Sequence, residues 1–149
     1  MVRLITESIS ILLNAAFGDG YKIYDESIEQ GLKEPCFFIQ CLKPTNNLFR
    51  GKRYYRTNEF CIQYFPVSNN KVTECEQVAE QLFEVLEWLT FYDDGTKLLG
   101  KDLHYEISDG VLSFFVNYDL FMRKNEELDA METVDVSFAE KKGAKNNGN

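Results

Sequence analysis

Histidine and cysteine, the residues that most often perform acid–base, nucleophilic or metal chemistry, are few and widely spaced in this chain. The one histidine, His104, falls in a predicted strand. An imidazole can act as a general base, but no neighbour in the sequence would orient this one, so an exposed or hydrogen-bonded strand histidine is the favoured interpretation. The cysteines form no Cys-x-x-Cys pair, and Cys36 and Cys41 would point to opposite faces of a strand, which disfavours a zinc site. We expect small, buried thiols in a reducing compartment such as the cytosol, at Cys36, Cys41, Cys61 and Cys75.

Phosphate and calcium motifs are also missing from the sequence. Gly18-Asp19-Gly20 ends a predicted helix instead of opening one, so it matches neither a dinucleotide-binding nor a Walker pattern. Asp93, Asp94 and Asp102 lack the spacing of an EF-hand loop. We therefore expect no catalytic residues, no metal and no cofactor.

Composition limits the remaining classes of protein. The chain has 149 residues, 44% of them hydrophobic and 14% aromatic, which suits one globular domain rich in strands. Its 24 acidic and 16 basic residues give a net charge of -8, which argues against binding duplex DNA as the main function. We find no secretory signal and no apolar run long enough to span a membrane.

Apolar periodicity predicts two helices. The first covers residues 2–17, and its predicted buried face comprises Ile5, Ile9, Leu12 and Ala16. Thr73 with Glu76 forms a capping-box pattern at the start of the second, although Ser68 or Asn70 could also cap it. The second helix has a predicted apolar side of Val78, Leu82, Val85 and Leu89, extended by Trp88 and Phe91, and an acidic outer face of Glu76, Glu80, Glu84 and Glu87.

Alternating polarity predicts the strands. They cover residues 21–24, 36–42, 54–65, 103–107 and 111–122, with a short piece at Leu98 and Leu99 and a polar loop at 43–47. Ser108-Asp109-Gly110 favours a tight hairpin between the last two strands, and Asp93-Asp94-Gly95 predicts a turn. In the last strand, the even-numbered residues from Leu112 to Met122 share one face, and the odd-numbered residues from Val111 to Asp119 share the other.

The resulting fold class is α+β, with two helices packed on a mainly antiparallel sheet in the order α-β-β-β-α-β-β. We expect a single domain over residues 1–128 and an extended C-terminal arm and polar tail over 129–149. Residues 140–149 are expected to be disordered in the isolated chain.

Two features predict contacts between copies of the chain. Adjacent aromatics, Phe37 with Phe38 and Phe114 with Phe115, would point to opposite sheet faces, so the face without helices needs a cover. The basic cluster Arg50, Lys52, Arg53 and Arg56 is a short candidate patch for nucleic acid, but electrostatic docking on the acidic helix face of a neighbouring copy is favoured in an acidic molecule. The interface candidates are therefore Arg50, Lys52, Arg53, Arg56, Glu80, Glu84 and Glu87, together with Val134, Val136 and Phe138 in the arm.

Several segments carry a family resemblance. They are Ile23-Tyr24-x-Glu26, Gln30-Gly31-Leu32-x-x-Pro35-Cys36-Phe37-Phe38-Ile39, Arg53-Tyr54-Tyr55, Phe60-x-Ile62-x-Tyr64-Phe65-Pro66 and Met131-Glu132-x-Val134. With them, residues 1–135 resemble a bacteriophage tail terminator family, of the kind encoded by phages, prophages and phage-tail-like bacteriocins of low-GC Gram-positive bacteria.

The resemblance implies a structural protein of the virion tail, assembled in the bacterial cytoplasm and without catalysis. Such proteins form a ring, usually a hexamer, on the head-proximal end of the tail tube. The ring ends polymerisation and presents a surface for the neck, and in contractile tails it also meets the last sheath ring. DNA would pass only transiently through the lumen, and the net negative charge would disfavour its retention.

Two alternatives remain open at this point. Another neck adaptor, such as a head- or tail-completion protein, would share the size and fold class. A small monomeric enzyme or ligand-binding domain would instead have a deep pocket around His104.

Overall fold

The computed structural model describes residues 1–25, 31–124 and 132–135. In this part of the chain, two helices and eleven strands follow in the order α1 (Val2–Phe17), β1 (Lys22–Tyr24), β2 (Cys36–Cys41), β3 (Thr45–Arg50), β4 (Arg53–Thr57), β5 (Glu59–Phe65), α2 (Lys71–Val85), β6 (Trp88–Thr90), β7 (Lys97–Leu99), β8 (Lys101–Ser108), β9 (Val111–Asn117), β10 (Leu120–Lys124) and β11 (Glu132–Asp135). The α+β class is confirmed.

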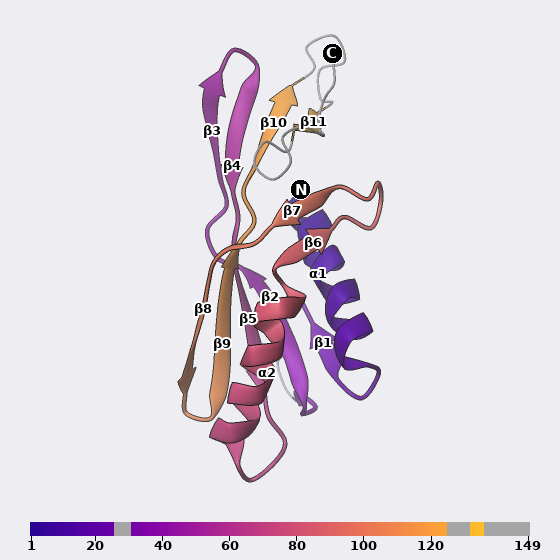
Figure 1. Ribbon diagram of the computed structural model, residues 1–149, viewed down its shortest axis with the longest axis vertical. Helices are drawn as coiled ribbons and strands as arrows, with labels where there is room; N and C mark the ends of the chain where they lie inside the picture. The colour runs from indigo at the N-terminus through magenta and orange to yellow at the C-terminus, as the bar shows by residue number, and fades with distance from the viewer. Residues whose placement is uncertain (26–30, 125–131, 136–149) are drawn as a thin grey trace.

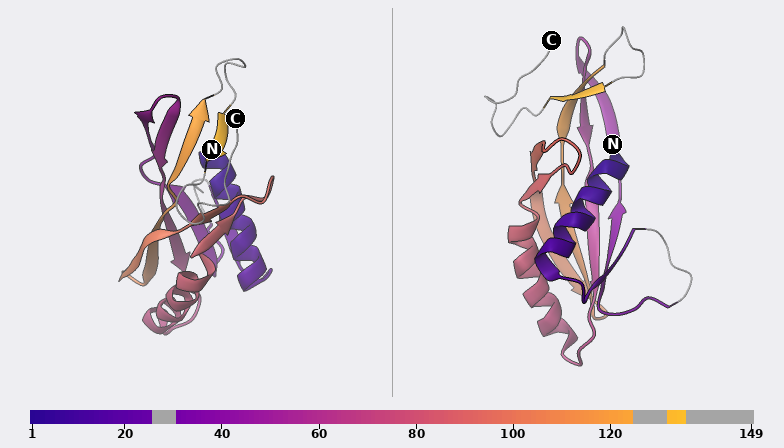
Figure 2. Two further views of the ribbon diagram at one scale, coloured as in Figure 1. Left: turned by 45° about the horizontal axis from the view of Figure 1, so that its top comes forward. Right: turned by 90° about the vertical axis from the view of Figure 1, so that its right-hand side faces the viewer.

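The body of the molecule is a five-stranded sheet, called here the main sheet, in the order β1-β2-β5-β9-β8. Its strands pair antiparallel except β1 and β2, which are parallel. Both helices pack on one face, α1 beside β2 and α2 beside β9 (Figures 1 and 2). The opposite face, called the far face below, is turned away from both helices.

The core lies between the helices and the main sheet. As alternation predicts, even-numbered positions of β9 such as Leu112, Phe114 and Val116 are buried, and so are Phe60 and Ile62 of β5. The prediction for α1 was partly wrong. Its buried stripe is Ile5, Ile9 and Leu13, whereas Leu12 is half-buried and Ala16 is exposed. The buried residues follow i, i+4, i+8 spacing. Because four residues make slightly more than one helical turn, the buried stripe drifts around the helix, and Ala16 lies outside it.

Two predicted strands each proved to be two strands in different sheets. Residues 54–65 divide at Asn58 into β4 and β5, and residues 111–122 divide at Tyr118 and Asp119 into β9 and β10. The pairing register continues across the division, because Glu59 pairs with Asn117 on one side and Arg56 pairs with Leu120 on the other. A two-stranded ribbon therefore leaves the main sheet and bends into a second sheet.

This second sheet, called the projecting sheet, has the order β11-β10-β4-β3 and extends beyond the body at one end (Figure 1). The polar loop predicted at 43–47 is incorrect, because Thr45 already begins β3. β3 and β4 form a hairpin across Gly51 and Lys52, and Gly51 adopts a φ of +57° that suits glycine in such a turn. Pairing with β4 thus outweighs the low strand propensity of Asn46 and Asn47.

The second helix differs from the prediction at both ends. The capping box was wrong: α2 begins at Lys71 and Asn70 is the N-cap, which was one of the alternatives. The carboxylate of Glu74 instead accepts hydrogen bonds from the backbone N–H groups of Ser68 (2.9 Å) and Val67 (3.3 Å). The helix ends at Val85, so Leu89 and Trp88 belong to β6. Leu89 is buried there, but Trp88 is 40% exposed.

The predicted turns are confirmed. Asp109 and Gly110 have φ values of 55° and 74° and join β8 to β9, as expected for a tight hairpin. Gly95 turns the chain between β6 and β7, and β7 includes the short piece predicted at Leu98 and Leu99.

Candidate assembly surfaces

The β3–β4 hairpin exposes apolar side chains at its tip. Leu48 is 63% exposed and Phe49 is 56% exposed, although both belong to a strand. Arg50 and Lys52 follow them in the chain and are also exposed. β3 is in addition an edge strand of the projecting sheet. Exposed apolar residues on a projecting edge strand are an aggregation hazard unless a partner covers them. The sequence contained a signal for this tip in the pair Leu48-Phe49 between polar residues.

The basic cluster divides into two parts. Arg53 is half-buried, with its Cζ 4.8 Å from the centre of the Phe121 ring. The same ring contacts Phe49 and Tyr55, each with a centroid distance of 4.9 Å. Arg56 is half-buried too, and its Nη1 lies 3.6 Å from Met122 Sδ. Arg53 and Arg56 therefore pack against side chains of the projecting sheet, while Arg50 and Lys52 are exposed at the hairpin.

The outer face of α2 is acidic and exposed, as predicted for Glu80 and Glu84. Glu87 is exposed as well, but it lies beyond the end of the helix, directly before the exposed indole of Trp88, so its predicted place on the helix was wrong. In Figure 1 the β3–β4 hairpin lies at the end of the molecule opposite to the start of α2.

The far face of the main sheet is a mixture of aromatic and polar side chains. Register places Gln40, Cys61, Phe115 and His104 in one row across β2, β5, β9 and β8. The His104 ring stacks on Phe115 with a centroid distance of 4.8 Å and an interplanar angle of 18°. Phe38 lies on this face as well, and Phe38 and Phe115 are only half-buried. As predicted, the two residues of each adjacent aromatic pair lie on opposite faces of the main sheet. No helix of the described residues covers the far face (Figure 2).

The predicted C-terminal arm is described only over β11. Val134 pairs with Met122 of β10 through the backbone. Val136 and Phe138, the other two interface candidates in the arm, lie outside the described residues, as does the polar stretch 140–149.

In the described part of the chain, His104 and the cysteines lie apart from one another. His104 is exposed, and its Nδ1 lies 2.8 Å from the carbonyl oxygen of Asp102. Burial raises the pKa of Cys61 to about 11, so this thiol is protonated and unreactive at neutral pH. A hollow of about 490 Å³ lies between α1 and β1, at the sheet edge opposite to β8 and hence away from His104.

The described residues contain no cluster of three or more His, Cys, Asp or Glu side chains that could hold a metal ion. Neither of the two helices described here is long and apolar enough to cross a membrane.

The described residues thus form a two-helix α+β body with a projecting, partly apolar hairpin. A family model described as phage tail terminator protein matches residues 4–130. The chain therefore belongs to the phage tail terminator family, a family of structural proteins, and is a component of a phage tail. A search of the curated proteins gives no match.

Proposed function

We propose that this chain forms a closed ring, a hexamer, on the head-proximal end of a phage or phage-like tail tube. The ring ends polymerisation of the tube, and of the sheath where one exists, and provides the attachment surface for the neck. Its partners are copies of itself, the tail tube protein, the sheath protein and a neck or head-completion protein. Assembly takes place in the cytoplasm of the bacterial host.

The observation that carries this proposal is the exposed tip of the β3–β4 hairpin. Burying Leu48 and Phe49 against a partner would remove most of their exposed apolar surface from water, a gain of about 1–2 kcal/mol for each side chain. A monomer would carry this surface at the risk of edge-to-edge association. In a closed ring this surface would be covered, because each hairpin would contact the same acceptor surface on the next copy. The rotation that relates neighbouring copies would bring the last copy into contact with the first.

The acceptor that we propose is the acidic face of α2 on the neighbouring copy. Arg50 and Lys52 at the hairpin tip complement Glu80, Glu84 and Glu87, and exposed Trp88 offers an apolar contact for Leu48 or Phe49. The half-buried aromatics of the far face support a second contact with an adjacent subunit. We propose that the arm, residues 129–149, adds Val134, Val136 and Phe138 to an interface with the sheath or a neighbour.

The net charge of -8 suits a ring through which a genome passes. A lumen lined with carboxylates would repel the phosphate backbone and allow DNA only transient contact. Neutralising the lumen carboxylates of the assembled ring should slow genome passage. Passage at an unchanged rate would refute this part of the proposal.

A tube-growth assay tests the proposed function. Purified tube protein is polymerised with and without the chain, and tube lengths are measured by negative-stain imaging. The wild-type chain should shorten the tubes and cap one end. The double variant Leu48→Ser, Phe49→Ser should fold but lose capping, whereas Val67→Ser, which alters a residue 59% exposed in the connection before α2, should cap normally.

The outcomes separate the alternatives. Tubes of unchanged length with bound wild-type protein would favour a neck adaptor that joins an already finished tail. Tubes that neither shorten nor bind the wild-type chain would contradict the proposal.

A further inference from the structure

The projecting sheet is joined to the main sheet through a bend in a two-stranded ribbon. One strand crosses at Asn58, between β4 and β5, and the other crosses at Tyr118 and Asp119, between β9 and β10. Two-stranded ribbons twist easily because they have few neighbours to restrain them. The direction of the hairpin must therefore be fixed by contacts at the bend.

On the core side, these contacts are hydrogen bonds. Asn58 Nδ2 donates to the carbonyl oxygen of Tyr118 at 2.9 Å, and the Tyr118 N–H donates to the carbonyl oxygen of Asn58 at 2.9 Å. The Tyr118 hydroxyl donates to the carbonyl oxygen of Leu86, the C-cap residue of α2, at 2.6 Å. The bend is thus fastened to the body, but none of these bonds reaches the side chains of the projecting sheet.

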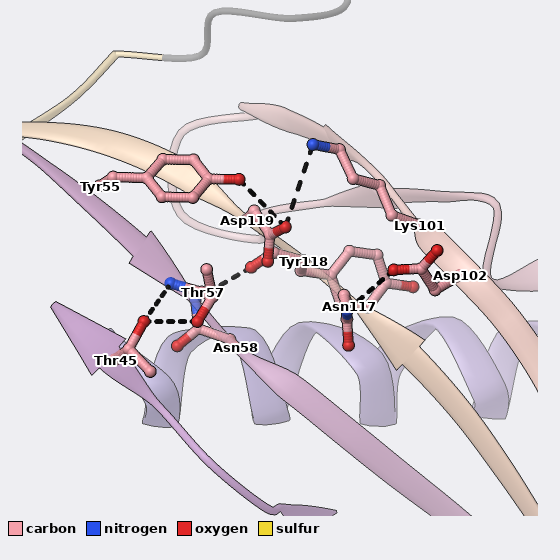
Figure 3. Close-up of polar contacts among 9 residues, drawn as sticks. All are labelled: Thr45, Tyr55, Thr57, Asn58, Lys101, Asp102, Asn117, Tyr118 and Asp119. Carbon is pink, nitrogen blue, oxygen red and sulfur yellow. Dashed lines mark hydrogen bonds and ion pairs between the residues drawn. The ribbon is translucent and has the colours of Figure 1, made fainter. Parts of the chain in front are cut away.

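On the far side of the ribbon, one carboxylate contacts both sheets (Figure 3). Asp119 is only 8% exposed. Its Oδ2 accepts a hydrogen bond of 3.2 Å from the Tyr55 hydroxyl, which belongs to β4 of the projecting sheet. The same oxygen lies 3.9 Å from Lys101 Nζ, which belongs to β8 of the main sheet. Since a buried carboxylate is costly unless it is paired, these two partners stabilise its position.

A bulge in β8 places Lys101 on this side. His104 pairs with Phe115, but Lys101 pairs with Asn117, so the register shifts by one residue between them. The extra residue is accommodated where Asp102 adopts a φ of +55°, and the Asn117 amide donates to Asp102 Oδ2 at 3.3 Å. In an unshifted register Lys101 would point toward the helices. The bulge turns it to the far face, where it meets Asp119.

We propose that Asp119 is a positioning residue for the hairpin: its contacts with Lys101 and Tyr55 hold the projecting sheet at one angle to the main sheet. The hairpin is then presented to its partner in a fixed direction, which lowers the entropic cost of docking. Only this consequence rests on the proposed function, because the angle is a property of the isolated chain. The bulge in β8 places Lys101 beside Asp119 and so provides one of the two contacts of Asp119.

Residual dipolar couplings of backbone amides test the proposal on the full-length chain in solution. In the wild type, one alignment tensor should fit the couplings from both sheets. In Asp119→Asn and in Lys101→Met, the couplings of β3, β4 and β10 should shrink or rotate relative to those of the main sheet. Lys101→Arg, which keeps the ion pair, should retain the wild-type angle, and Glu106→Gln, an exposed change on the far face of β8, should have no effect.

The outcomes are decisive in both directions. A single tensor with the wild-type angle in Lys101→Met and Asp119→Asn would overturn the positioning role. If Asp119→Asn does not fold, Lys101→Met and Tyr55→Phe carry the test, because each leaves the carboxylate in place. If the angle between the two sheets changes while rings form as in the wild type, the positioning role of Asp119 is supported. The same result would count against docking by the hairpin.

Discussion

At the scale of single residues, the carbonyl oxygen of Leu86 marks the point where three segments meet. The hydroxyl of Tyr118 donates to it, and the backbone of Gly100 passes close beside it. A Cβ added to Gly100 would lie 2.7 Å from this oxygen and 2.9 Å from Val116 Cγ2. Gly100 is therefore required by close packing at the junction of α2, β8 and the bend.

Gly100→Ala should lower the free energy of unfolding by about 1–3 kcal/mol, because a backbone carbonyl cannot move away from the new methyl group without disturbing the end of α2. Gly20→Ala is the matched control. A Cβ there meets nothing within 4 Å, so the change should stay within about 0.5 kcal/mol. Urea unfolding followed by circular dichroism measures both, and equal effects of the two substitutions would contradict the packing argument.

Glu74 should make stability depend on pH. Burial acts to raise its pKa, but hydrogen bonds from the Tyr64 hydroxyl, Ser68 and Val67 outweigh burial and lower the pKa below its ordinary value. A carboxyl group with a lower pKa in the folded state stabilises the fold above its unfolded pKa of about 4.3, and loses this contribution as the pH falls through the folded pKa.

Glu74→Gln should therefore destabilise the protein by about 1 kcal/mol at pH 7, with a difference from wild type that shrinks below pH 4. Glu76→Gln, on the exposed face of the same helix, should have little effect at either pH. Chemical unfolding at pH 7 and at pH 3 gives the comparison. A difference that grows as the pH falls would show that Glu74 has the opposite sign of shift.

At the scale of elements, the sequence predicted what periodicity determines. Both helices, the buried face of residues 112–122 and the turns at Asp109-Gly110 and Asp93–Gly95 follow from local patterns. The bend did not, because alternation from Leu112 to Met122 runs through it without interruption. The hairpin was missed because Asn46 and Asn47 favour loops, and only pairing with β4 makes them a strand. Alternation correctly placed Asp119 on the face opposite to Leu112 and Met122. Its burial there was not predicted, because it depends on Tyr55 and Lys101, which are distant in sequence.

The proposed contact between hairpin and helix predicts a charge-exchange result. Arg50→Glu with Lys52→Glu should abolish ring formation through like-charge repulsion, and so should Glu80→Lys with Glu84→Lys. The chain that carries all four changes should assemble again, because the complementarity is restored in the opposite sense. Analytical ultracentrifugation reads the assembly state of each variant.

A control pair changes the net charge of the chain by the same amount as Arg50→Glu with Lys52→Glu, but at other places on the surface. Lys33→Glu with Lys97→Glu alters two exposed lysines outside both proposed surfaces and should leave assembly intact. Failure of the four-change chain to assemble, with all variants folded, would show that the hairpin docks elsewhere than on α2.

At the scale of the whole molecule, family membership, the projecting hairpin and the main-sheet face without a helix of the described residues support the proposal that neighbouring copies complete this subunit. The candidate site could be predicted in part. Residue types located the two charged surfaces, and the resemblance supplied the class of protein. The exposed apolar tip, the division of the basic cluster and the bulge at Asp102 depend on strand pairing and required the three-dimensional structure.

The proposed electrostatic docking predicts that assembly is sensitive to salt. Each copy carries a net charge of -8, so neighbours attract only where local patches of opposite sign meet within about 10 Å, the screening length at 0.1 M salt. The fraction of protein in rings should fall as ionic strength rises from about 0.05 to 0.5 M. Sedimentation across a salt series measures it, and rings that strengthen with salt would indicate that apolar contacts dominate.

Size measurement by light scattering, paired with negative-stain imaging of the protein with and without tail tubes, tests the central claim most directly. The account predicts particles near six times the chain mass of 17.3 kDa, or a single cap at one end of each tube if rings form only there. A chain that stays monomeric and leaves both tube ends bare would contradict it.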